Sequence, residues 1–176
     1  FDTLQQCDLS ILPKTMDIMA LAYGAVIAEA VENLTEDYSP QEEIFILLQQ
    51  ALVLLSSHNK RLVVVSSLCK LLSLCGFDPE LETCTTCHEK IEGDAYFSTV
   101  QGGVVCDNCS IGAELPFAVG TRELMLKLQH LDFENPEKFV VRGADLMQLE
   151  QTLYKFLVYQ TDKPLVSLQF LAQMSV

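Results

Sequence analysis

The chain has 176 residues, of which 49% are hydrophobic, and a formal net charge of −13 that gives a pI near 4.4. This composition excludes disorder and collagen-like structure, and the longest strongly apolar run, from Ile18 to Ala28, is too short for a membrane-spanning helix. So acidic a chain is also a poor stand-alone binder of nucleic acid, because Lys and Arg drive phosphate binding.

Three helices are predicted before residue 80. Apolar residues recur with a helical period from Met16 to Leu34. The sequence Ser39-Pro40-Gln41-Glu42 is a capping box with Pro at the first helical position, and it predicts the start of a second helix. The apolar residues of that helix are expected to point inward: Ile44, Phe45, Leu47, Leu48, Ala51, Leu52 and Leu55.

The third helix is predicted from Arg61 to Cys75, and Gly76 ends it as a C-terminal cap. Its β-branched run Val63-Val64-Val65 leaves a strand as the alternative there. Between Cys84 and Cys109 the helical period is lost. Two short apolar pieces, Ala95–Ser98 and Val104-Val105, flank a turn at Gly102-Gly103 and predict a hairpin.

Helical periodicity returns in three later segments, near 121–131, 144–160 and 165–174. We therefore expect a mainly α fold, a helical bundle with an inserted four-cysteine zinc ribbon made of small β hairpins. The predicted parts are a first helical region at 1–82, the ribbon at 83–110, and a second helical region at 111–176 that packs on the first.

The chemistry of the insert lies in two Cys-x-x-Cys pairs, Cys84/Cys87 and Cys106/Cys109, separated by 18 residues. Zinc prefers four soft ligands in a tetrahedron, and a spacer of 15–20 residues is usual for two such pairs. Four thiolates saturate the metal, so one structural, non-catalytic Zn²⁺ is predicted. The total of seven cysteines is odd and indicates a reducing compartment rather than a disulfide framework.

Other interpretations of the cysteines stay open. A dithiol redox site would need one pair at a helix N-terminus with a lowered thiol pKa. Cys84-Thr85-Thr86-Cys87-His88 is also the attachment string of c-type haem, although haem leaves the second pair unexplained. His88 is interpreted as a surface residue or a donor near a thiolate, and it could replace one cysteine as a ligand.

The order of these parts resembles a known family. A Leu-rich helix leads into Leu74-Cys75-Gly76-Phe77-Asp78-Pro79-Glu80-Leu81, followed by the first cysteine pair, Tyr96-Phe97-Ser98, Gly102-Gly103 and the second pair. The closing segment reads Lys163-Pro164-Leu165-Val166-Ser167-Leu168-Gln169-Phe170-Leu171. Together these motifs resemble the bacterial recombination mediator family RecO.

This resemblance implies a non-enzymatic protein of DNA repair and homologous recombination, found in the bacterial cytoplasm near the nucleoid. Its implied partners are RecR and the acidic, Phe-ended tail of single-stranded DNA-binding protein, with no membrane and no small-molecule substrate. Lys60, Arg61 and Lys70 are the candidate cations for that tail.

The resemblance further implies an N-terminal OB-fold that supplies much of the DNA contact and that we expect upstream of Phe1. DNA binding by the present chain is therefore expected to be weak or absent. Alternative functions are a zinc-ribbon interaction module of the transcription or translation apparatus and a dithiol oxidoreductase.

Overall fold

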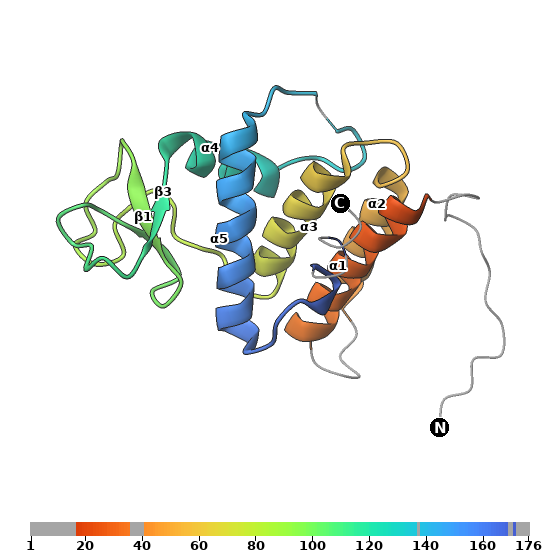
Figure 1. The fold of residues 1–176 in the computed structure, drawn as a ribbon, viewed down its shortest axis with the longest axis horizontal. Coiled ribbons are helices and arrows are strands. Elements are labelled where there is room, and N and C mark those ends of the chain that lie inside the picture. Colours follow the sequence, from red (N-terminus) through yellow and green to blue (C-terminus); the bar gives the residue numbers. More distant parts are fainter. Residues whose placement is uncertain (1–16, 36–40, 137, 169–170, 172–176) are drawn as a thin grey trace.

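The fold is mainly α, as predicted, with one small antiparallel sheet (Figure 1). The computed structural model describes residues 17–35, 41–136, 138–168 and 171. Its elements in chain order are α1 (Ile18–Leu34), α2 (Glu42–Leu54), α3 (Lys60–Leu74), β1 (Ala95–Ser98), β2 (Gly103–Val105), β3 (Leu115–Phe117), α4 (Val119–Gln129) and α5 (Gly143–Thr161). None of the described helices is long and apolar enough to cross a membrane.

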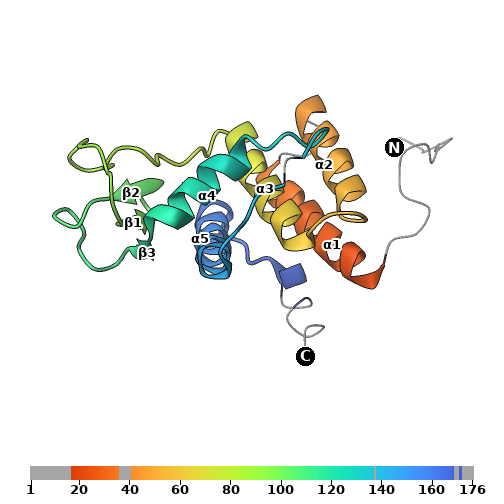
Figure 2. The same ribbon diagram turned by 90° about the horizontal axis from the view of Figure 1, so that it is seen from above.

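Helix α3 is the centre of the helical body, because it packs against α1, α2, α4 and α5 (Figure 2). Its residues from Val63 to Cys69 are all buried, including Ser66 and Ser67, whose hydroxyls donate to backbone carbonyls. Burial on every side explains the Val63-Val64-Val65 run, so the strand alternative is wrong and tertiary packing decides in favour of helix.

Both ends of α3 are fixed by local hydrogen bonds. The Asn59 side chain accepts from the backbone N–H of Leu62 at 3.3 Å and caps the N-terminus. Gly76 adopts a φ of +79°, and the N–H of Phe77 donates to the carbonyl of Leu72 at 2.8 Å. This is the Schellman arrangement, which confirms the predicted glycine cap.

The two preceding helices differ from the prediction in detail. Helix α2 begins at Glu42, and its cap residue Gln41 makes no side-chain capping bond, so the helix starts later than a capping box at Ser39 and Pro40 requires. Ser39 and Pro40 themselves lie outside the described residues. Phe45 was expected to point inward, but it is 65% exposed because the buried face of α2 runs through Ile44, Leu47 and Ala51 instead.

The predicted helix at 144–160 is confirmed as α5, and α4 ends at Gln129, slightly before its predicted end. Of the last predicted helix, the structure describes helical residues at 166–168 and 171. That segment is tied to α1, because the carboxylate of Glu29 accepts from the backbone N–H groups of Val166 and Ser167, each at 2.8 Å, and from the Ser167 hydroxyl.

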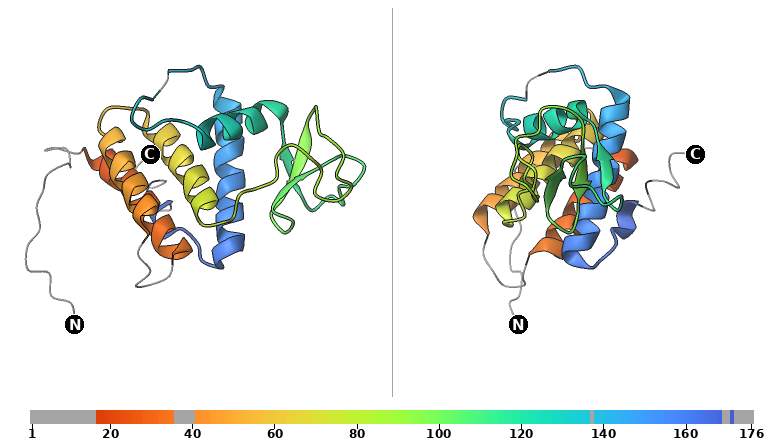
Figure 3. Two further views of the ribbon diagram at one scale, coloured as in Figure 1. Left: turned by 180° about the vertical axis from the view of Figure 1, so that it is seen from behind. Right: turned by 90° about the vertical axis from the view of Figure 1, so that its left-hand side faces the viewer.

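The sheet lies at one end of the molecule, beyond α4 and α5 (Figures 1 and 3). Its strand order is β2-β1-β3, with Phe97 opposite Val104 on one side and Leu115 on the other. The β1–β2 hairpin was predicted, whereas β3 was missed and extends the sheet past residue 110. A three-residue strand with Pro116 at its centre carries almost no sequence signal, and Pro116 is tolerated because β3 is an edge strand.

Aromatic packing joins the sheet to the helices. The ring of Phe97 is fully buried and lies 5.4 Å from the ring of Phe117 and 5.3 Å from that of Phe156 on α5, between centroids. The Phe97–Phe156 pair meets at 77°, an edge-to-face geometry that aromatic rings favour. The ribbon is therefore docked on α5 through a shared core rather than attached only through its two chain connections.

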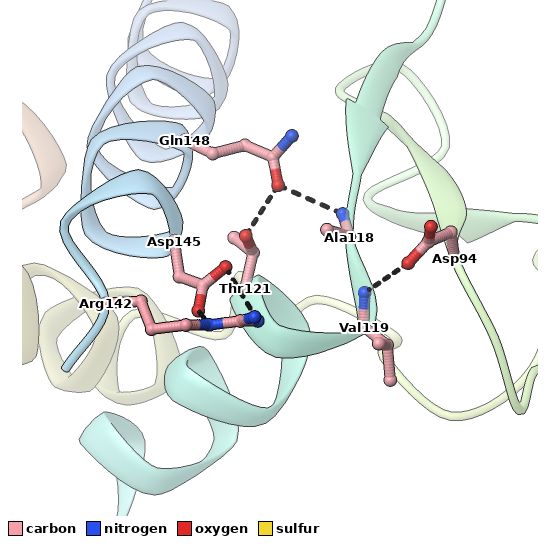
Figure 4. A network of polar contacts seen from close by, with 7 residues as sticks. All are labelled: Asp94, Ala118, Val119, Thr121, Arg142, Asp145 and Gln148. Atoms are coloured by element: carbon pink, nitrogen blue, oxygen red, sulfur yellow. Dashed lines mark hydrogen bonds and ion pairs between the residues drawn. The ribbon is translucent and has the colours of Figure 1, made fainter. Parts of the chain in front are cut away.

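Polar contacts add to this junction at the start of α4 (Figure 4). The Gln148 side-chain oxygen on α5 accepts from the N–H of Ala118 at 3.0 Å and from the Thr121 hydroxyl. Asp94, just before β1, accepts from the N–H of Val119 at 2.9 Å. N–H groups at the α4 N-terminus are thus capped by side chains from the ribbon and from α5, although the cap residue Ala118 cannot do so itself.

Candidate metal centre

Each cysteine pair is held in a tight backbone turn. In the first turn, the N–H of His88 donates to the carbonyl of Cys84 at 2.9 Å, and His88 adopts a φ of +63°. In the second, the N–H of Ser110 donates to the carbonyl of Cys106 at 3.0 Å. The two turns are closed by equivalent bonds, so each delivers two thiols to the same side, as the zinc-ribbon prediction requires.

The sheet brings the two turns together. The backbone N–H of Thr85 donates to the carbonyl of Val104 at 2.9 Å, which joins the first turn to the end of β2. Gly103 is needed for this approach, because a Cβ there would lie 2.9 Å from the Thr85 side chain and 2.6 Å from the Glu80 carbonyl oxygen. A residue without a side chain therefore lets the first turn pack against β2.

The four cysteines form one cluster. The Sγ atoms of Cys84, Cys87, Cys106 and Cys109 all lie within 4.8 Å of one another, and the Sγ atoms of Cys87 and Cys106 are 3.8 Å apart. A tetrahedron with Zn–S bonds of about 2.3 Å has an S···S edge of about 3.8 Å. The quartet predicted from the spacing is therefore assembled in a geometry that can hold a metal ion.

Burial and electrostatics differ among the four thiols. Cys84 is buried and Cys87 is exposed. Burial alone would raise the pKa of Cys84, but the N–H groups of Cys106, Cys87 and Thr86 point at its sulfur and lower the pKa to about 6. The neighbouring sulfurs of Cys106 and Cys87 instead raise the pKa of Cys109 to about 12. Four adjacent thiolates repel one another, and a bound divalent cation removes that repulsion.

The competing interpretations of the cysteines find no support in this geometry. Neither Cys-x-x-Cys pair lies at the N-terminus of a described helix, as a dithiol redox site would need. His88 is exposed and is not part of the sulfur cluster. In a haem site the Cys84 and Cys87 sulfurs would be bonded to the macrocycle, whereas here they face the second pair.

The predicted partner-binding cations do not share a site. The Lys60 ammonium lies 3.1 Å from a carboxylate oxygen of Asp17. Arg61 makes two hydrogen bonds to Glu150 on α5, at 2.9 and 2.6 Å, beside an apolar cavity between α1, α3 and α5. The Lys60 side chain is partly exposed and that of Asp17 is exposed, and a surface ion pair of this kind is worth about 1 kcal/mol or less.

Lys70 lies two to three turns further along α3, and its ammonium is 5.4 Å from the centroid of the Phe133 ring. Lys60, Arg61 and Lys70 thus line three different parts of the surface. Helical spacing places them on one element, but it does not place them around one groove.

A groove that the sequence did not reveal lies at the start of α3. Its volume is about 410 Å³, and apolar side chains make up most of its wall. The lining residues are Leu54, Ser57, His58, Asn59, Leu62, Val63, Leu131, Phe133, Pro136, Lys138 and Phe139. We call it the basic groove, because its charged or titratable lining residues in the described chain are His58 and Lys138, with no carboxylate. Only the fold brings the 131–139 loop to α3, so local sequence carries no signal for it.

Comparison with known proteins identifies relatives. Residues 16–169 match the family model described as "Recombination protein O C terminal". Three similar proteins, all called DNA repair protein RecO, come from Pelotomaculum thermopropionicum (29% identical over 97% of this chain), Bacillus pumilus (28% over 98%) and Desulforamulus reducens (27% over 88%). The matches cover 68%, 69% and 62% of those relatives, respectively, so the chain spans about two thirds of their length.

Proposed function

The chain belongs to the RecO family of DNA repair proteins, and from this premise we propose that it is the helical and zinc-ribbon part of a non-enzymatic recombination mediator. In this proposal the protein acts with RecR in the bacterial cytoplasm, near the nucleoid, to help load recombinase onto DNA coated by single-stranded DNA-binding protein and to anneal complementary strands. Family membership favours this role over a ribbon module of the transcription or translation apparatus.

We propose that the cysteine quartet holds one structural zinc ion. The sulfur separations fit a tetrahedral ion, and four thiolate ligands leave no position open for water or substrate. The described strands of the ribbon are three or four residues long, and the fully buried ring of Phe97 packs on Phe156 of α5, so in this proposal the metal holds the two cysteine turns in addition to that shared packing. The protein is accordingly proposed to turn over no substrate.

The basic groove is the observation that supports a docking role. A peptide that ends in an acidic stretch and a terminal Phe presents an aromatic ring, a carboxylate and further negative charge. The groove offers an apolar wall for the ring and Lys138 for the carboxylate, and its lining residue Asn59 is the N-cap of α3, where the helix dipole favours negative charge. The proposal therefore adds Lys138 and His58, and for Lys60, which does not line the groove, a part in partner binding stays a prediction.

For Arg61 and Lys70 a part in partner binding stays a prediction, since both lie away from the basic groove. DNA contact in the whole protein is assigned to an additional N-terminal OB-fold. With a net charge of −13, the present region is expected to bind DNA weakly or not at all.

Peptide binding tests the docking role. A fluorescein-labelled acidic peptide with a free C-terminal Phe is titrated with the protein at low salt, and fluorescence anisotropy is measured. We expect binding that weakens at least 10-fold when the peptide is amidated at its C-terminus and several-fold in Lys138→Ala. Lys155→Ala, an exposed lysine on α5, is the matched control and is expected to bind normally.

The contrary result is equally clear. No affinity for the free-acid peptide at low salt, or equal affinity for its amide, contradicts docking of a tail carboxylate in the basic groove.

A further inference from the structure

A second groove lies on the other side of the 131–133 loop, between α2 and the C-terminal half of α3. Its volume is about 470 Å³. Ser73, Gln129 and His130 also line a neighbouring hollow of about 440 Å³ between α4 and the 78–82 segment. There the Asp78 carboxylate accepts from the Ser73 hydroxyl and the Gln129 side chain. We call these two adjoining hollows together the acidic groove. Tail docking in the basic groove does not use this surface, although Lys70, one of the predicted partner-binding cations, lines it.

Two large apolar side chains are exposed within the acidic groove. Ile46 on α2 and Leu74 at the end of α3 both line it, and each is 41% exposed. Their neighbours Leu47 and Leu72 are buried in the core, whereas Ile46 and Leu74 are left at the surface. Exposed apolar side chains in a concave surface are typical of an interaction site.

The charge of this groove is opposite to that of the basic groove. Carboxylates line it at both ends, with Glu43 and Asp132 in the first hollow and three more in the second: Asp78, Glu80 and Glu82. The cationic or titratable lining residues in the described chain are Lys70 and His130. Lys70 lies against the Phe133 ring, and, after hydrogen bonds from the loop backbone, its charge is one of the causes that lower the pKa of Asp132, so it offsets part of one carboxylate and leaves the other four.

The exposed apolar side chains and the carboxylates of the acidic groove together favour one kind of binding partner. Nucleic acid and anionic lipid surfaces are repelled by the five carboxylates. A second copy of this chain is also a poor match, because the chain has 24 acidic and only 11 basic residues. We infer that the acidic groove binds a Lys- or Arg-rich segment of a protein partner, with an apolar side chain of that segment seated between Ile46 and Leu74.

A defined probe tests this inference on the chain as it stands. The probe is a fluorescein-labelled 12-residue peptide of Lys and Leu in helical register, used beside one peptide with Ser in place of Leu and one with Glu in place of Lys. Anisotropy is measured at low salt, and hydrogen exchange maps the contact. We expect the Lys/Leu peptide alone to bind tightly and to protect amides at 43–50 and 70–74.

Matched variants locate the binding. Ile46→Ser with Leu74→Ser, or Glu43→Lys with Asp132→Lys, is expected to weaken binding at least 10-fold. The controls are Leu21→Ser and Glu32→Lys on α1, also exposed but outside the groove, and they are expected to change binding less than 2-fold.

Three results overturn the inference: no binding of the Lys/Leu peptide, equal binding of the Ser-containing peptide, or an equal loss in the α1 controls. The Ile46→Ser and Leu74→Ser pair lies outside the 131–139 loop that walls the basic groove, so the outcome of that pair is independent of tail docking there.

Discussion

Removing the Phe156 ring tests how the ribbon is attached to the helices. Phe156 is 1% exposed, and its ring meets the fully buried ring of Phe97 edge to face. Phe→Ala substitutions in cores cost about 3–5 kcal/mol, because transfer free energy is lost and a cavity is left. The lost aromatic pair, worth about 0.5–1.5 kcal/mol, places Phe156→Ala in the upper part of that range.

Against a total stability of about 5–15 kcal/mol, this loss is large. Urea unfolding followed by circular dichroism measures it as a change in midpoint at constant slope. Tyr159→Ala is the matched control, because Tyr159 is an aromatic residue of the same helix that is 50% exposed, and we expect it to cost less than about 0.5 kcal/mol.

Metal content gives the second readout. The cysteine turns are fixed by bonds within the ribbon, so Phe156→Ala is expected to retain its metal while the whole fold becomes less stable. A loss of stability below about 1 kcal/mol, or one equal to that of Tyr159→Ala, would refute a shared core between ribbon and helices.

Three further substitutions have defined outcomes. Cys87→Ser should weaken zinc binding more than about 100-fold and expose the ribbon to protease. Loss of a group that only hydrogen-bonds a metal ligand already costs about 10–100-fold in affinity, and loss of a ligand itself costs more. Full zinc retention in a chelator assay would contradict this prediction. Gly103→Ala should destabilise the fold by about 1–3 kcal/mol in urea, because its Cβ would meet the Glu80 carbonyl oxygen, whereas Gly93→Ala has open space and should be near neutral. Burial would raise the pKa of Glu29, but hydrogen bonds from the 166–167 segment outweigh burial and hold that pKa below its ordinary value near 4.5. The ionised Glu29 carboxylate therefore stabilises the folded protein above about pH 4.5, and this contribution is lost as the pH falls through the lowered pKa. The stability difference between the wild type and Glu29→Gln should therefore shrink in acid, and a difference that is the same at pH 7 and pH 3 would contradict the assignment.

Patterns of residues close together in the sequence were sufficient to predict much of this fold. The glycine cap of α3, the β1–β2 hairpin and the two cysteine turns each depend on residues close together in the chain, and each was predictable. The Val63-Val64-Val65 run was ambiguous because helix and strand both accommodate a fully apolar segment, and only packing on all sides decides between them.

Features that depend on distant segments were not predictable. Phe45 has the right spacing to be buried, but no element covers that side of α2 in the described structure. Arg122 shows the reverse, since a charged residue of an amphipathic helix is expected at the surface, yet it is 7% exposed and its Nη1 has no hydrogen-bond partner in the described residues. The basic groove depends on Lys138, which reaches α3 only through a long loop.

The central claim is that four sulfurs bind one structural zinc ion, and X-ray absorption at the zinc edge tests it most directly. With the metal content measured on the same sample, the account predicts one zinc per chain with four sulfur neighbours at about 2.3 Å and no nitrogen or oxygen ligand. A folded, zinc-free protein, or a metal coordinated by fewer than four sulfurs, would contradict it.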